Sequence, residues 1–191
     1  MKIEELRKKT NKAEIHICIY FGYEWQRGIS DCTDDQYWVS IREQFCHQLK
    51  SYEKDGLVRV ELRRLRASHG RFIWDSIFEK IKAADLLVFD VAKRGASGKH
   101  SGTGGRSAKF NLNVLLELGA AMALKKRVLI MCPETDMKSF PSDLCGLLLT
   151  CYKSRSAGGK FNREFVDSRG LFPQLRAMLR QVIEEKMVEN G

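Results

Sequence analysis

A single carboxylate stands out in the segment from Asn111 to Met131, where leucine, valine and alanine predominate. The segment reads as an apolar helix that leads into a buried strand, and Glu117 is its only acidic residue. An ionised glutamate in apolar surroundings is unfavourable unless it is paired or faces a cleft. Glu117 is therefore a candidate reactive group. The alternative is a structural acid that interacts with the helix dipole or a nearby arginine.

Other polar and aromatic residues lie where a ligand is expected. Asp90 ends an apolar run typical of a central parallel strand, where it binds a ribose hydroxyl or caps the next turn. Asn111 and Asn113 flank the start of the Glu117 helix, where they cap it or bind a sugar or phosphate. Trp25 and Trp74 stack on a base or pack in the core. Both interpretations stay open for each residue.

The loop from Lys93 to Phe110 is rich in glycine and serine, but it is not a P-loop. Gly98 and Lys99 are followed by histidine instead of serine or threonine, and Gly95 is too close for the required spacing. The loop is predicted either as a mobile connection or as a lid that closes over a phosphorylated ligand.

Strand-like and helix-like periodicities alternate along the whole chain. The predicted strands are 14–20, 57–62, 86–92, 127–132 and 148–152, and the predicted helices are 34–56, 72–85, the helix of Glu117, 140–148 and 170–189. This alternation predicts an α/β fold, flavodoxin-like and doubly wound, with a mostly parallel five-stranded sheet. Ligands of such folds bind beyond the carboxyl ends of the strands. One domain is expected over residues 1–191, with 1–13 as a flexible or helical extension.

Composition narrows the class of protein. The chain has 191 residues, a net charge of +9 and six cysteines, without a membrane-spanning apolar run or a signal peptide. We expect a cytoplasmic protein with reduced thiols, and no metal site because cysteine and histidine do not cluster. The basic surface is either solvated or attracts phosphorylated molecules. Nucleic acid is not expected, because aromatic residues do not alternate with the basic clusters.

Three motifs occur in order in the C-terminal half. They comprise Asn113, Val114, Glu117, Leu118 and Gly119, then Arg127 and Val128, then Pro141, Ser142, Asp143, Leu144 and Gly146. This half, from about Ile73 to Tyr152, is similar to the TIR-like domains of bacterial anti-phage effectors, of the STING and Pycsar effector type.

The N-terminal half contains the sequence IYFGYEW, Ile19 to Trp25. It resembles the first strand of the nucleoside 2-deoxyribosyltransferases, a family of the same superfamily. The resemblance implies that Tyr20 and Gly22 lie at the base of a pocket, and that Phe21 and Trp25 contribute to substrate binding.

Both resemblances imply that Glu117 is the catalytic carboxylate. TIR enzymes cleave the nicotinamide–ribose bond of NAD, and the transferases attack the anomeric carbon of a nucleoside. The transferases carry an aspartate eight residues before Asp85, where this chain has Ile77, and Asp75 is two residues away. This departure favours the TIR reading.

Three functions follow from these features. The first is an NAD glycohydrolase that serves in anti-phage defence or signalling, with NAD as substrate and no cofactor. The second is a nucleoside or nucleotide N-glycosidase or deoxyribosyltransferase that uses the same Glu117. The third is a non-catalytic nucleotide-binding or adaptor module, in which replacing Glu117 leaves function intact. A homo-oligomer or an activating partner protein is expected, and a membrane is not.

Overall fold

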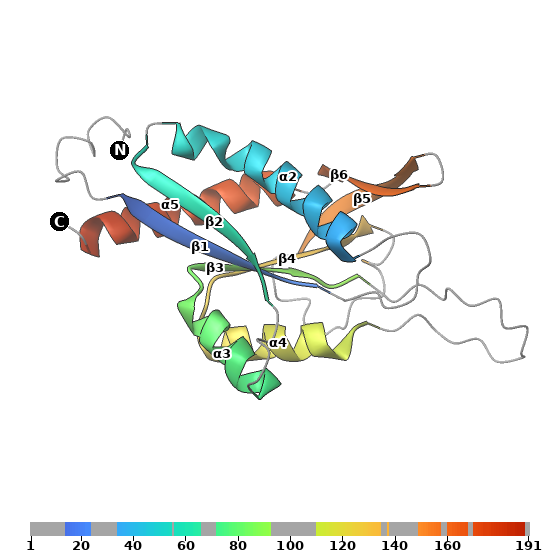
Figure 1. Cartoon of the computed structure of the whole chain (residues 1–191), viewed down its shortest axis with the longest axis horizontal. Helices are drawn as coiled ribbons and strands as arrows, with labels where there is room; N and C mark the ends of the chain where they lie inside the picture. Colours follow the sequence, from blue (N-terminus) through green and yellow to red (C-terminus); the bar gives the residue numbers. More distant parts are fainter. Residues whose placement is uncertain are drawn as a thin grey trace, which may run out of the picture.

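The structure is a computed structural model in which residues 14–23, 34–54, 56–65, 72–92, 110–134, 137, 149–157, 160–167 and 170–189 are described. These residues form one central sheet with helices on both of its faces (Figure 1). Among the described helices, none is long and apolar enough to cross a membrane.

The sheet has the strand order β2-β1-β3-β4-β5-β6. Its strands are β1 (Ile15–Gly22), β2 (Val58–Arg64), β3 (Leu86–Asp90), β4 (Val128–Pro133), β5 (Leu149–Ala157) and β6 (Lys160–Asp167). The first five pair in parallel, and β6 pairs antiparallel with β5. The order of the five parallel strands is that of a flavodoxin-like fold, which confirms the predicted fold class.

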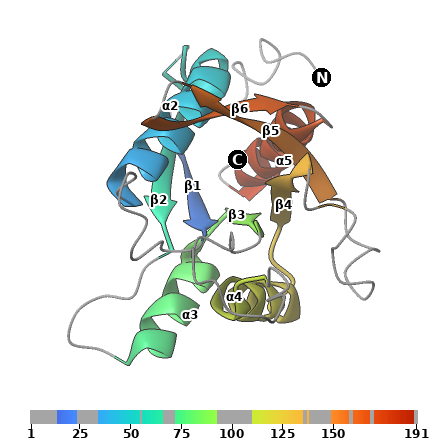
Figure 2. The same ribbon diagram turned by 90° about the vertical axis from the view of Figure 1, so that its right-hand side faces the viewer.

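Of the described helices, two pack on each face of the sheet (Figures 1 and 2). The helices are α2 (Asp34–Glu53), α3 (Ile73–Ala83), α4 (Leu112–Ala123) and α5 (Leu171–Glu189). Residues of α2 and α5 pack with Ile15, Ile17 and Ile19 in one apolar cluster. Residues of α3 and α4 form a second cluster with the side chains that point the other way. Alternation along each strand therefore supplies both cores.

The elements lie close to their predicted positions, with two differences. The sheet has a sixth strand, because β6 forms a hairpin with β5 in a region where no strand was predicted. The predicted helix over 140–148 falls outside the described residues. Cys132 and Cys151 are paired neighbours on β4 and β5, with their sulfur atoms 3.9 Å apart.

Candidate functional site

Glu117 lies in the second turn of α4 and points to the sheet. The helix begins at Asn111, whose side-chain oxygen accepts hydrogen bonds from the backbone N–H groups of Asn113 (2.8 Å) and Val114 (3.4 Å). This cap fixes the start of the helix. With the buried residues Val114, Leu118 and Ala121 on the same side, Glu117 is directed inward and is only 8% exposed.

The Glu117 carboxylate meets the carboxyl end of β1 at Gly22. A β carbon at Gly22 would lie 3.1 Å from Glu117 Oε2 and 2.5 Å from two atoms of the Phe89 ring. The missing side chain at Gly22 therefore provides the space that the carboxylate and the ring occupy. Gly22 and Phe89 are also paired neighbours on β1 and β3, so the register of two strands places this contact.

This contact lies at the topological switch point of the sheet. From β1 the chain continues to β2 on one side, and from β3 it continues to β4 on the other. In doubly wound sheets, ligands bind in the crevice outside the carboxyl ends of these two central strands. Gly22 and Asp90 end β1 and β3, so Glu117 contacts one of the two strand ends that border this crevice.

Burial raises the pKa of the Glu117 carboxyl to about 7, because desolvation disfavours its charged form. Within the described part of the chain, no hydrogen bond or ion pair of this carboxyl is found to offset that effect. The helix dipole acts most strongly in the first turn of a helix, and Glu117 lies beyond the first turn of α4. The structural alternative, an acid held by a dipole or an arginine, therefore has no support in the described residues.

Tyr20 lies on the same face of the sheet as Glu117 and is buried. Its hydroxyl accepts a hydrogen bond from Arg63 Nη1 (3.3 Å), whose guanidinium carbon lies 6.0 Å from the ring centroid. Arg63 Nη2 in turn donates to Glu61 Oε2 at 2.6 Å. Tyr20 is thus held by a neighbouring strand, two residues before the glycine that contacts Glu117.

Two further residues predicted for the site point to the opposite face. Phe21 packs edge-on against Phe45, with ring centroids 4.7 Å apart, in the cluster formed by α2 and α5. Asp90 is buried, and it accepts hydrogen bonds from the Tyr152 hydroxyl (2.9 and 3.1 Å) and the Ala92 backbone N–H (3.2 Å). These contacts tie β3 to β5. A ribose-binding role of Asp90 stays a prediction.

The remaining predicted residues are dispersed. Asn113 is exposed one turn before Glu117, within reach of a molecule that would contact that side of α4. Trp25 and most of the loop after β3 fall outside the described residues. Trp74 is 42% exposed and so does not pack in the core. Phe89 was not predicted, although alternation along β3 would have placed it on the side of Glu117. The described residues contain no cluster of metal ligands.

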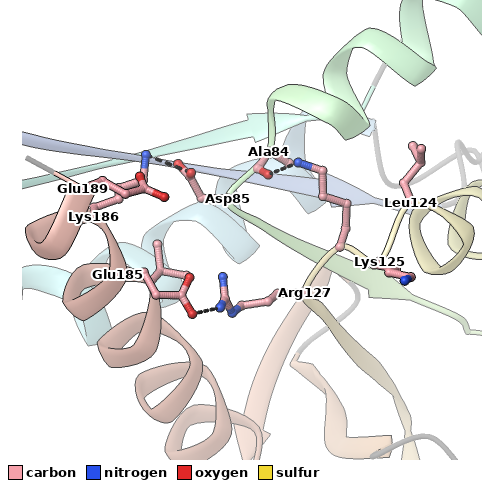
Figure 3. A pocket seen from close by; sticks show the side chains of 10 residues that line it. Ala84, Asp85, Leu124, Lys125, Arg127, Glu185, Lys186 and Glu189 are labelled. Atoms are coloured by element: carbon pink, nitrogen blue, oxygen red, sulfur yellow. Dashed lines mark hydrogen bonds and ion pairs between the residues drawn. The ribbon is translucent and has the colours of Figure 1, made fainter.

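A polar pocket of about 400 Å³ lies at the amino ends of the strands, between the ends of α4 and α5 and the starts of β3 and β4 (Figure 3). Four of its charged residues form two ion pairs. Lys186 Nζ lies 2.9 Å from Asp85 Oδ1, and Arg127 pairs with Glu185. These two ion pairs join α5 to the starts of β3 and β4, remote from Glu117.

Comparison with known proteins gives no family. Neither a protein family nor a curated protein matches the sequence. Among solved structures, the chain is similar to a 2-desoxiribosyltransferase from Leishmania mexicana, with a TM-score of 0.40 and 17% identity over 79% of each chain. It is also similar to a mutant flavo di-iron protein from Thermotoga maritima, with a TM-score of 0.39 and 12% identity over 93% of this chain and 38% of that one. These similarities concern the fold alone.

Proposed function

We propose that the protein breaks the N-glycosidic bond of a nucleoside or nucleotide, and that the Glu117 carboxylate acts on the anomeric carbon. The observation that carries this proposal is a buried carboxylate, without a described partner, beside the strand ends where α/β folds bind ligands. A carboxylate in this setting is also the group that glycosidic chemistry requires.

The reaction follows from the charge that develops on the sugar. As the bond between C1′ and the base nitrogen breaks, its electron pair leaves with the base and positive charge builds on the ribose. The Glu117 carboxylate stabilises this charge or forms an ester with C1′. Water then attacks C1′, releases the sugar and restores the carboxylate, while the base nitrogen gains a proton unless it leaves as a neutral ring. A second base in place of water gives transfer.

Burial of Glu117 favours the transition state over the bound substrate. The carboxylate has no described cation to offset its desolvation, so the positive charge on the ribose becomes its partner only as the bond breaks. An interaction that forms only in the transition state lowers the barrier to reaction.

A nucleoside or deoxynucleoside is the substrate that we place first. The motif residues Tyr20 and Gly22, which resemble those of the deoxyribosyltransferases, lie on the Glu117 face of β1, and Gly22 contacts the carboxylate.

NAD is the second candidate, and a different observation favours it. In the described part of the chain, no second carboxylate lies beside Glu117, because Asp75 is exposed on α3 and Asp90 points to the other face. Nicotinamide leaves NAD as a neutral molecule and needs no general acid, whereas most bases do.

The test is incubation of the purified protein with nucleosides, deoxynucleosides, nucleoside monophosphates and NAD, followed by chromatography. We expect release of the base or of nicotinamide from one class. Glu117→Gln should lower this activity by about 10³-fold or more, as loss of a catalytic carboxylate does. The wild-type rate should rise with pH and reach half its maximum near pH 7, because the carboxyl must ionise and burial raises its pKa to about 7.

The matched control is Glu43→Gln, which makes the same change on an exposed position of α2 and should leave the rate unchanged. Activity that survives in Glu117→Gln would overturn the catalytic role of this residue. Absence of turnover with every substrate, with binding of a nucleotide retained, would favour the non-catalytic binding module.

A further inference from the structure

The solvent-facing side of α4 carries an apolar stripe. Leu112 and Leu116 are 73% and 56% exposed, and Gly119 and Ala123 continue the stripe at exposed positions. Their spacing of four, three and four residues has the period of a helix–helix contact. Glu117, the only charged residue of this helix, is buried toward the sheet. A helix that lacks charge on its exposed side is expected to be covered by another surface.

The start of α3 widens this apolar face. Figure 2 shows α3 and α4 side by side on one face of the sheet. Four residues from the N-cap to the middle of α3 are also exposed: Phe72, Ile73, Trp74 and Phe78. With roughly 200 Å² for each large apolar residue, these four together with Leu112 and Leu116 expose about 700 Å². This summed area approaches the roughly 800 Å² that each partner buries in a standard interface.

The order of residues along the stripe indicates what covers it. Large side chains occupy its first half, Leu112 and Leu116, and small ones its second half, Gly119 and Ala123. An antiparallel copy of the same helix would place Leu112 opposite Ala123 and Leu116 opposite Gly119. Two-fold symmetry makes each of these pairs occur twice. The stripe is therefore complementary to itself under a two-fold axis, which is the requirement of a symmetric dimer.

The presence of glycine at position 119 is a second observation in favour of this arrangement. A β carbon at Gly119 would meet nothing within 4 Å, so packing within the chain does not require glycine there. A glycine inside a helix is less stable than an alanine, because it loses more conformational freedom on folding. Close approach of a second helix gives this glycine a function.

We propose that two copies of the chain associate about a two-fold axis through antiparallel α4 helices, flanked by the starts of α3. Association through the sheet edge at β2 is disfavoured, because Arg59, Glu61 and Arg63 present exposed charges along that strand.

The test measures the mass of the full chain in solution by sedimentation equilibrium over a range of concentrations. Wild type should form a dimer. Leu116→Glu and Gly119→Leu should each weaken association by about tenfold or more, because the first buries an unpaired charge and the second fills the space for the opposite leucine. Both positions are exposed in the single chain, so circular dichroism should show a native fold in both variants.

The matched control is Val188→Glu, which places the same charge on an exposed apolar position of α5, across the sheet from α4. This variant should remain dimeric. A wild-type chain that stays monomeric at its highest soluble concentration overturns the proposal. So does a dimer or larger assembly that survives both the Leu116→Glu and the Gly119→Leu change. None of these outcomes depends on catalytic activity.

Discussion

At the scale of single residues, Glu117 should lower the stability of the fold above mildly acidic pH. Its pKa rises from 4.5 to about 7 on burial, so between these values the folded chain holds a proton that the unfolded chain releases. The free energy of unfolding should therefore fall as pH rises from 4.5 to 7, by about 3 kcal/mol from this group. Glu117→Gln should stabilise the protein at pH 8 and change little near pH 4, as measured by urea unfolding.

The isosteric change Glu43→Gln on α2 provides the comparison. It should leave the dependence of unfolding on pH as it is in wild type. A loss of stability in Glu117→Gln that is greater at pH 8 than near pH 4 would show that the carboxylate is paired in the folded protein, which contradicts the site described above.

Gly22 should be intolerant of even one added carbon. A β carbon there would lie 2.5 Å from the Phe89 ring, and both the ring and the strand end must shift to admit it. Gly22→Ala is expected to destabilise the fold by about 1–3 kcal/mol and to reduce activity by displacing Glu117. Thermal unfolding measures the first effect and base release the second.

Gly119→Ala is the matched change at a glycine with open space around its α carbon. At concentrations where the chain is monomeric, this change should stabilise it by about 0.5–1 kcal/mol, because alanine favours a helix. If both alanine variants raised the melting temperature, the close contact at Gly22 would be refuted.

The sequence singled out Glu117 and, through a motif, Tyr20 and Gly22 on the same face, but it did not predict Phe89. Glu117 was found because one acid interrupts an apolar pattern. Phe21 and Asp90 were assigned to the same site by motif and by strand position, yet alternation turns them to the other face. The Phe89 contact depends on the register between β1 and β3, and no local pattern of one sequence encodes that register.

At the scale of elements, α4 ends with a strained residue. Lys125 has a φ of 53°, and the hydrogen bonds from Lys125 N–H to the Met122 carbonyl and from Lys126 N–H to the Ala121 carbonyl form a Schellman motif. Glycine adopts this conformation without the clash of a β carbon. Lys125→Gly should therefore raise the free energy of unfolding by about 1 kcal/mol in denaturant titration.

Lys125→Ala separates strain from charge. It removes the same ammonium group but keeps the β carbon, so we expect no comparable gain. Equal stabilisation by both changes would instead identify repulsion among the neighbouring lysines as the cause.

Elements with strong periodicity were predictable, and β6 was not. The three isoleucines of β1 and the apolar side of α5 are visible in the sequence, and both elements lie where the pattern places them. Residues 160–167 mix charged and aromatic residues without clear alternation. The Gly158–Gly159 pair between β5 and β6 was the usable signal, because two-residue glycine turns are typical of hairpins.

At the scale of the whole molecule, the fold class followed from the alternation of strand and helix, since few topologies accommodate it. The strand order then determined where a ligand should bind. The separation of the two cores was implied by the alternation of side chains in β1, but which helices cover which face required the crossovers to be seen in space (Figures 1 and 2).

The ion pairs between α5 and the starts of β3 and β4 have a consequence for engineering. Lys186 forms an ion pair with Asp85, and Arg127 forms one with Glu185. The last described helix therefore ends beside the amino ends of the strands, where β1 also begins (Figure 1). Glu117 lies near the opposite, carboxyl ends of the strands. A fluorescent reporter or a second module joined directly after α5 would therefore start at the ends of the strands that are remote from Glu117.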